Sequence, residues 1–329
     1  MSYFICFDLE GPLSPQDNAY ELMKLFPNGD RVFEIISRYD DLLTLAGRED
    51  YEPGDALALI VPFLLYHGIR EVDITRLAQQ AKLVDGARRT IQRLHSRGWR
   101  VFCISTSYQQ YALAITQRLS IPQQMVGCTS FPLDSYHQIL CEEDLFKVEQ
   151  AEKEILSLSG GDDEQIKYRL DNFFWVELPK VRLGEVVKEV KPIGGRRKVA
   201  ALHRFASRYG QPLSSFIAIG DSITDFRMLQ AVDQAGGLAI AFNANEYALP
   251  YATLGLASTE LSDLIPPLDA WERGGRKAVE AVVKEKEKAG GRGNREHFHW
   301  LAKVKHLEQP LEIHRQIRRI VREEAARLG

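Results

Sequence analysis

Cysteine is scarce in this chain, with 4 Cys among 329 residues. Cys6 and Cys103 fall within apolar runs, and Cys128 and Cys141 have no partner at the spacing of metal ligands. This scarcity excludes a disulfide framework and a cysteine-rich zinc site. We interpret the four residues as small hydrophobic side chains in a reducing cytoplasm.

Long apolar runs and a large net charge are also lacking. No stretch reaches the roughly 18 apolar residues of a membrane helix, and the longest run, residues 56–66, is interrupted by Pro62 and predicts a core helix. A net charge of −3 does not favour nucleic-acid binding. The amino terminus enters a strand-like run at once, so we expect no signal peptide. We therefore expect a cytoplasmic protein without membrane insertion or nucleic-acid partners, long enough for more than one domain.

The most informative feature of the sequence is a pair of acidic turns. One is Phe-Asp-Leu-Glu-Gly-Pro-Leu at residues 7–13, and the other is Gly-Asp-Ser-Ile-Thr-Asp at residues 220–225. Each follows an apolar run, residues 3–7 and 216–219, of the length and composition of a buried parallel strand. The carboxylates are thus predicted at the carboxyl edge of an open α/β sheet, where ligands bind.

Carboxylates in both turns suit magnesium-dependent phosphoryl transfer. A phosphate ester is anionic, so carboxylates repel it unless a hard cation such as Mg²⁺ stands between them. One aspartate, ionised at pH 7, can then attack phosphorus and form an acyl phosphate.

Hydroxyl groups and a lysine complete the pattern. The apolar run at residues 100–104 predicts a further strand, and it ends in Ser105, Thr106 and Ser107, whose hydroxyls can bind a phosphate oxygen. Lys198 lies 22 positions before Gly220 and opens a helical pattern, so its ammonium can face developing negative charge. Other cations compete for this role: Lys191, Arg196 and Arg197.

At this point the sequence resembles the haloacid dehalogenase superfamily of phosphatases, in its phosphoserine phosphatase-like branch. The order of nucleophile turn, hydroxyl strand, lysine and acidic turn carries the resemblance. It implies that Asp8 is the nucleophile, Glu10 the general acid and base, and Lys198 the residue that neutralises charge and contacts phosphate. It further implies that Ser105 contacts the phosphate, although the neighbouring Thr106 or Ser107 could serve instead. The implied metal ligands are Asp8, Glu10 through its carbonyl, and Asp221, with Asp225 in support.

Two positions depart from that family's pattern. Glu10 stands where aspartate is usual and is one methylene longer, and Pro12 replaces a frequent threonine. An Asp-Leu-Glu-Gly turn also resembles a relative that passes phosphate to homoserine. The opening of the chain is similar to an archaeal group, some members of which are described as a subunit of an energy-converting hydrogenase.

The predicted fold class is α/β, with a doubly wound, Rossmann-like parallel sheet, a helical cap and a helical carboxyl-terminal extension. The core would comprise residues 1–14 and 85–270 with an insertion at about 135–190, and the cap residues 15–84. Candidate substrate contacts in the cap are cationic: Arg31, Arg38, Arg48 and His67.

The extension, residues 271–329, differs in charge from the remainder. It holds 15 Lys and Arg against 9 Asp and Glu, about +6, while the remainder carries about −9. Helices are predicted at 276–289 and 310–328. The extension is expected to pack on its own acidic core, or to bind a second copy of the chain or another protein. A metal site at His297 and His299 is a weaker alternative.

The sequence therefore predicts an Mg²⁺-dependent phosphatase that hydrolyses a small phosphorylated metabolite through an aspartyl phosphate on Asp8. Two alternatives remain open. One is a binding or assembly subunit that keeps the fold without turnover, and the other is a phosphotransferase acting on an alcohol.

Overall fold

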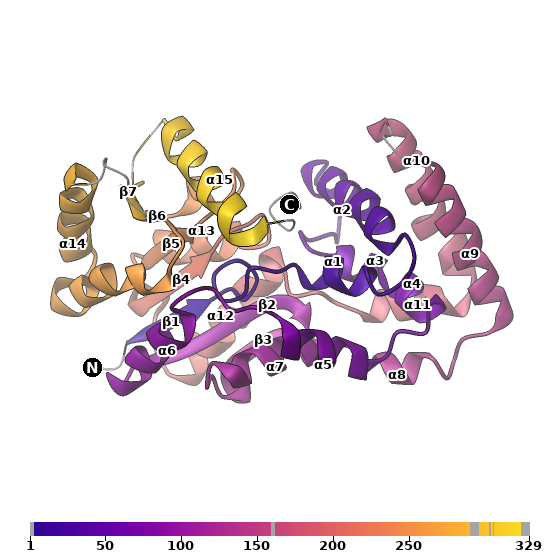
Figure 1. Ribbon diagram of the computed structural model, residues 1–329, viewed down its shortest axis with the longest axis horizontal. Helices are drawn as coiled ribbons and strands as arrows, with labels where there is room; N and C mark the ends of the chain where they lie inside the picture. Colours follow the sequence, from indigo (N-terminus) through magenta and orange to yellow (C-terminus); the bar gives the residue numbers. More distant parts are fainter. Residues whose placement is uncertain (1–2, 159–161, 290–295, 303, 305, 324–329) are drawn as a thin grey trace.

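A seven-stranded sheet organises the structure, a computed structural model that describes residues 3–158, 162–289, 296–302, 304 and 306–323 (Figure 1). The strand order is β3-β2-β1-β4-β5-β6-β7, in which β7 is antiparallel to β6 and the other neighbours are parallel. The strands are β1 (Phe4–Phe7), β2 (Arg100–Tyr108), β3 (Val126–Thr129), β4 (Phe216–Gly220), β5 (Leu238–Phe242), β6 (Leu254–Ser258) and β7 (Glu296–Trp300).

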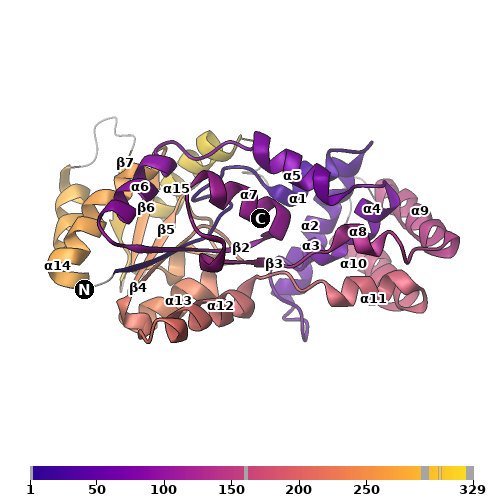
Figure 2. The same cartoon turned by 90° about the horizontal axis from the view of Figure 1, so that it is seen from below.

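Helices cover both faces of this sheet, which is why its central strands are apolar throughout. Every residue of β1, β4, β5 and β6 is buried. Figure 2 shows α12 and α13 on one side of the sheet and α6, α7 and α15 on the other. Their bounds are α6 (Ala87–Ser96), α7 (Gln109–Arg118), α12 (Gly195–Arg208), α13 (Phe226–Gln234) and α15 (Glu308–Arg322). The predicted α/β class with a doubly wound parallel sheet is confirmed.

The register of the central strands brings the predicted motifs to one edge. Phe7 of β1 lies opposite Cys103 of β2 and Ile219 of β4. The residues that follow, Asp8, Ile104–Ser105 and Gly220–Asp221, therefore lie at the same level of the carboxyl edge. The chain leaves β1 toward β2 on one side and later returns to β4 on the other, so the edge opens at a topological switch point.

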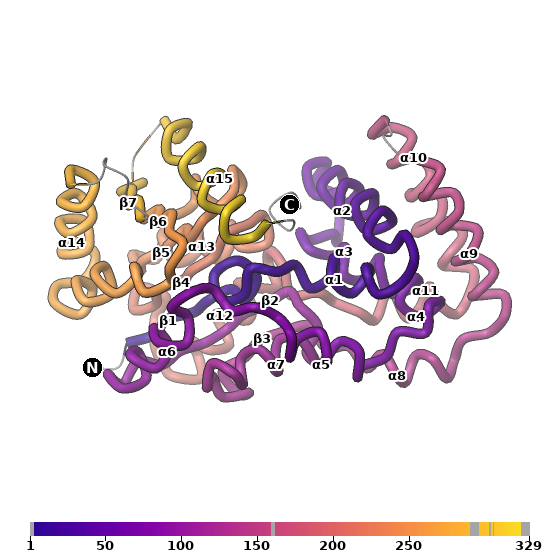
Figure 3. The backbone as a smooth tube through the Cα atoms, in the orientation of Figure 1, coloured from indigo at the N-terminus to yellow at the C-terminus, as the bar shows by residue number. Residues whose placement is uncertain are grey.

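Two further groups of helices lie beside the carboxyl edge (Figures 1 and 3). The first group precedes β2 and the second follows β3, and α9 and α10 of the second pack on α2 of the first. The two groups are α1 (Asn18–Met23), α2 (Gly29–Leu45), α3 (Ala56–Leu59), α4 (Val61–Tyr66) and α5 (Glu71–Gln80), then α8 (Leu133–Tyr136), α9 (Glu142–Ser157), α10 (Asp163–Asn172) and α11 (Arg182–Glu189). The domain limits at residues 15–84 and 135–190 stay predictions. None of the described helices is long and apolar enough to span a bilayer.

The carboxyl-terminal extension is not wholly helical, which corrects the prediction. Helix α14 (Ile265–Ala289) begins earlier than expected and is interrupted by non-helical backbone at Gly274 and Gly275. Strand β7 then joins the sheet edge, with Phe298 opposite Leu256 of β6. Its sequence, Glu-His-Phe-His-Trp, lacks β-branched residues, so the pattern gave little sign of a strand. Residues 324–328 of the expected last helix lie outside the described residues.

Candidate active site

The nucleophile turn places Asp8 directly after β1. The Asp8 amide donates a hydrogen bond of 2.8 Å to the Ile219 carbonyl, which ties this turn to the end of β4. Gly11 has a φ of +98°, and a Cβ there would lie 2.4 Å from the Asp221 carboxyl carbon. Only glycine permits both this backbone conformation and the close approach of the two acidic turns.

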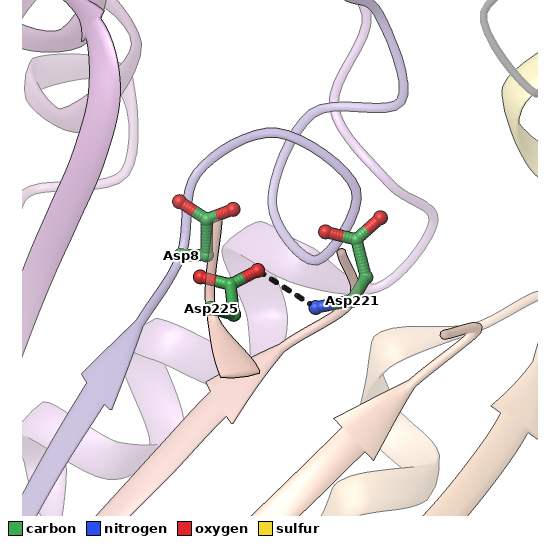
Figure 4. Close-up of side chains that lie close together, drawn as sticks. All are labelled: Asp8, Asp221 and Asp225. Carbon is green, nitrogen blue, oxygen red and sulfur yellow. Dashed lines mark hydrogen bonds between the residues drawn. The ribbon is translucent and has the colours of Figure 1, made fainter. Parts of the chain in front are cut away.

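The second acidic turn is held by its own aspartate. The Asp225 carboxylate accepts hydrogen bonds from the backbone amides of Asp221 (3.0 Å) and Ser222 (3.2 Å). Figure 4 shows the first of these bonds, with the Asp8 carboxylate beside that of Asp225. Gly220 is needed because a Cβ there would lie 2.5 Å from the Cβ of Asp225. Asp225 therefore shapes the turn that presents Asp221.

Three carboxylates meet at this edge. Among the described residues, the group of three or more side chains able to hold a metal ion is Asp8, Asp221 and Asp225, whose ligand oxygens lie within 4.8 Å of one another. Burial raises the pKa of Asp8 well above its ordinary value, and the negative charge of Asp225 adds to the rise. Such a cluster requires positive charge nearby to stay ionised.

Lys198 supplies part of that charge. Its side chain is fully buried, and Nζ donates to Asp8 Oδ1 (2.7 Å) and Asp225 Oδ1 (2.6 Å). Burial opposes the lysine charge, but Asp225 and Asp8 outweigh it and raise the pKa of Lys198 above its ordinary value. The competing cations Arg196 and Arg197 instead pair with Glu52 and Asp55, respectively.

The three hydroxyl residues of β2 have different surroundings. Thr106 lines the cavity above Asp8, and its Oγ1 donates 3.2 Å to the Ile193 carbonyl. Ser105 is fully buried, does not line that cavity, and its Oγ accepts from the Ser107 amide at 3.0 Å. Ser107 Oγ in turn donates to the Glu10 carboxylate. Of the two predicted phosphate contacts, Thr106 is thus the better placed, and the role of Ser105 stays a prediction.

Glu10 also lines the cavity. Its Oε1 accepts hydrogen bonds from Ser107 Oγ and, at 3.2 Å, from the Asn18 amide. Burial raises the pKa of Glu10 to about 8, the Asp17 carboxylate adds to the rise, and the Ser107 hydrogen bond opposes it. These surroundings favour the protonated form of Glu10 at neutral pH.

The cavity lies between the sheet edge and α2 and α3 and has a volume of about 100 Å³. This is room for a small polar group with a few waters. On the side of the helices it is lined by Asp17, Ala19, Phe33, Ser37, Asp40, Asp41, Ala56 and Leu57.

None of the four cationic candidates from the predicted cap lines this cavity. Arg38 pairs with Asp163 at 2.6 Å, and His67 lies 2.7 Å from Glu152. Arg48 covers the ring of Trp175. These three side chains join the two helical groups to each other, and the structure gives no support to any of the four as a substrate contact.

Two arginines that the sequence interpretation missed enter the site from α15. Arg318 and Arg322 are 4% and 7% exposed, and both line the cavity. Arg318 donates to Asp221 Oδ2, and Arg322 donates to the same oxygen at 2.9 Å and to the Pro15 carbonyl at 3.0 Å. Their i, i+4 spacing puts them on one helix face with His314, which is also buried. The expectation that the extension packs on its own acidic core is thus met by α15.

The donor set fits Mg²⁺. Asp221 Oδ1 is buried and has no hydrogen-bond partner among the described residues, although Oδ2 of the same carboxylate has two arginine donors. An unpartnered anionic oxygen next to the Asp8 carboxylate suits a hard, oxygen-seeking cation. Asp225, whose oxygens are engaged by Lys198 and backbone amides, is a supporting residue rather than an evident ligand.

The histidines of the extension do not form a comparable centre. The rings of His299 and His314 lie 5.9 Å apart, but neither belongs to a group of three metal-capable side chains within the described residues. His314 Nδ1 accepts from the Ala244 amide at 2.9 Å, and burial lowers the pKa of His314 to about 3. His299 of β7 and His314 of α15 thus pack against each other as neutral side chains.

Comparison with known proteins agrees with this geometry. Residues 129–260 match the model of the haloacid dehalogenase-like hydrolase family. Among solved structures, a gene product of Archaeoglobus fulgidus is 28% identical, with a TM-score of 0.86 over 100% of this chain and 99% of that one. A comparison with curated proteins found no match.

Phosphoserine phosphatase structures share the fold at lower identity. The apo form is 15% identical, with a TM-score of 0.52 over 80% of this chain and 98% of that one. A substrate-bound complex is 16% identical, with a TM-score of 0.53 over 80% and 97%. The predicted resemblance to haloacid dehalogenase-like hydrolases is confirmed.

Proposed function

Starting from a chain that has the haloacid dehalogenase fold and matches that hydrolase family over residues 129–260, we propose that it is an Mg²⁺-dependent phosphatase. Its substrate would be a small phosphomonoester, and the reaction would pass through an aspartyl phosphate on Asp8. The observation that carries the proposal is the buried Lys198 ammonium, which bridges Asp8 and Asp225 beside the unpartnered oxygen of Asp221.

In the first step an Asp8 carboxylate oxygen attacks phosphorus in line with the ester oxygen. The new P–O bond to Asp8 forms as the bond to the alcohol breaks, and the departing oxygen takes the proton from Glu10. Lys198 holds the Asp8 carboxylate in position and stabilises the charge that develops on the phosphoryl group. Thr106, which lines the same cavity, would contact a phosphoryl oxygen.

In the second step water attacks the phosphorus of the aspartyl phosphate. Glu10, now deprotonated, takes a proton from that water, and the P–O bond to Asp8 breaks to release inorganic phosphate. Asp8 is regenerated as a carboxylate and Glu10 as the acid. Asp8, Asp221 and the Glu10 carbonyl are the groups that would hold Mg²⁺, which when bound supplies positive charge to the phosphoryl oxygens.

A screen of small phosphomonoesters with Mg²⁺ tests the proposal, with the Asp8→Asn variant as control. We expect release of inorganic phosphate by the wild-type protein, a covalent mass increase on Asp8 in quenched samples, and neither in Asp8→Asn. A variant that keeps even a tenth of the wild-type rate would exclude Asp8 as the nucleophile. Phosphate recovered on added alcohols instead of water would point to a phosphotransferase, and no turnover on any ester to a binding subunit.

A further inference from the structure

Three cations face the three carboxylates of the two acidic turns. The carboxylates of Asp8, Asp221 and Asp225 face one ammonium and two guanidiniums. All six side chains are buried. In a site built only from the family's motifs, Lys198 alone would face the three carboxylates, and the site would carry a net charge of about −2.

The extra cations come from the extension, not from the core. Arg318 and Arg322 both donate to Asp221 Oδ2, and both line the cavity that contains Asp8 and Thr106. A guanidinium stays protonated at any physiological pH, so the two charges are permanent. Figure 1 shows α15 running toward the turn after β1, where Arg322 also binds the Pro15 carbonyl.

We propose that Arg318 and Arg322 form a built-in counter-charge that lets this site bind a phosphate group in the absence of metal, and that weakens binding of Mg²⁺ alone. The inference rests on the proposed function only in taking phosphate and Mg²⁺ as ligands of the site. It assigns a role in ligand binding to two residues of the extension.

The physical basis is the poor screening of buried charges. With three carboxylates and one lysine, an incoming phosphate meets net repulsion until a divalent cation arrives. Two added guanidiniums offset the remaining negative charge of these three carboxylates, so the repulsion of the anion falls and so does the attraction of the cation. Glu10 and Asp17 also face Arg322, and Asp40 and Asp41 line the same cavity. The two guanidiniums reduce the repulsion that these further carboxyl groups exert on an anion.

If the two arginines only anchored α15 to the core, the contacts of the Asp221 carboxylate would stay unexplained. Both guanidiniums converge on Oδ2, and Oδ1 is left buried without a hydrogen-bond partner among the described residues. An unpartnered buried acceptor is costly. The arrangement therefore offers one oxygen to a cation while the guanidiniums keep the other.

The test measures two affinities by calorimetry, that of Mg²⁺ alone and that of inorganic phosphate in chelator. In Arg318→Gln and in Arg322→Gln, we expect the Kd of Mg²⁺ to fall about tenfold or more and the Kd of phosphate to rise about tenfold or more. Arg315→Gln is the matched control, because Arg315 lies on the same helix but pairs with Glu246 at 3.3 Å outside the cavity. It should change both values by less than about twofold.

Charge-retaining variants separate charge from fold. Arg318→Lys and Arg322→Lys carry an ammonium in place of the guanidinium fork, so each should shift both affinities clearly less than its glutamine counterpart does. Lysine variants that behave like the glutamine variants would overturn the inference, as would glutamine variants that lose affinity for both ligands or for neither. Circular dichroism and thermal unfolding of each variant would show whether a shared loss reflects unfolding, which also counts against the inference.

These measurements do not depend on turnover, so the charge role and the proposed phosphatase activity can each fail while the other holds. Opposite shifts in a protein without phosphatase activity would uphold the charge role and reject the enzyme. An active phosphatase whose Kd values for Mg²⁺ and phosphate are unchanged in the Arg318 and Arg322 variants would uphold the enzyme and reject the charge role.

Discussion

At the scale of single residues, Glu10 is the position where this chain departs most from the family pattern and where its structure is most informative. The longer side chain reaches back to Ser107 and the Asn18 amide and lines the cavity. Its environment is that of a carboxylic acid kept protonated by burial. The substitution is therefore compatible with acid catalysis.

Replacing Glu10 by glutamine tests this role. If Glu10 supplies the proton, Glu10→Gln should slow alkyl esters by roughly 10² to 10⁴. An activated aryl phosphate, whose leaving group needs no proton, should form the aspartyl phosphate at nearly the wild-type rate. Because hydrolysis of that intermediate also needs Glu10, phospho-Asp8 should accumulate and be visible by mass spectrometry. Equal slowing of both ester types in single-turnover measurements would place the acid elsewhere.

The pH dependence follows from the same group. The pKa of Glu10 is raised to about 8, so the proton needed in the first step is present below that pH and lost above it. For an alkyl ester, the single-turnover rate of phosphorylation should fall as pH rises through about 8. The same profile for an aryl ester should be nearly flat in this range, and a fall shared by both would assign the titration to another group.

At the scale of elements, β7 and α15 convert a charged carboxyl-terminal extension into part of the core. Phe298, at the centre of β7, is 4% exposed and lies opposite Leu256, with Lys286 Nζ 4.7 Å above its ring. The strand closes the sheet edge, and α15 then crosses β6 to reach Asp221. The extension thus contributes both a strand of the sheet and two side chains of the cavity.

Shortening the Phe298 side chain should destabilise the whole chain. Phe298→Ala should lower the free energy of unfolding by about 3–5 kcal/mol, the usual loss for a buried phenylalanine. Ile320 of α15 is 63% exposed, so Ile320→Ala should change the free energy of unfolding by less than about 0.5 kcal/mol. Urea unfolding of both variants checks this, and equal effects would mean that β7 is not packed as described.

At the scale of the whole molecule, the site exists only where distant segments converge. Asp8 comes from the first strand, Lys198 from α12, Asp221 from the end of β4 and Arg322 from the last described helix. The helical groups on the other side close the cavity. Binding of the extension to a second copy or another protein stays a prediction.

Removal of metal should therefore abolish turnover without unfolding the chain. Chelator should eliminate phosphatase activity and Mg²⁺ should restore it, while Ca²⁺, with more ligands at longer distances, should substitute poorly. Asp221→Ala should weaken Mg²⁺ binding, measured by calorimetry, with an unchanged circular dichroism spectrum. Full activity in chelator would remove the metal from the mechanism.

The sequence by itself determined the central sheet and the positions of Asp8, Lys198 and Asp221, because strand-and-turn patterns are local and parallel strands collect their carboxyl ends at one edge. Only the tertiary structure decided that Thr106 rather than Ser105 lines the cavity, and that the predicted cap cations lie elsewhere. It also decided the contacts of Arg318 and Arg322 with Asp221, across 97 and 101 residues of chain. Such contacts leave no local signal, because a charged residue on an amphipathic helix looks solvated until the partner that buries it is known.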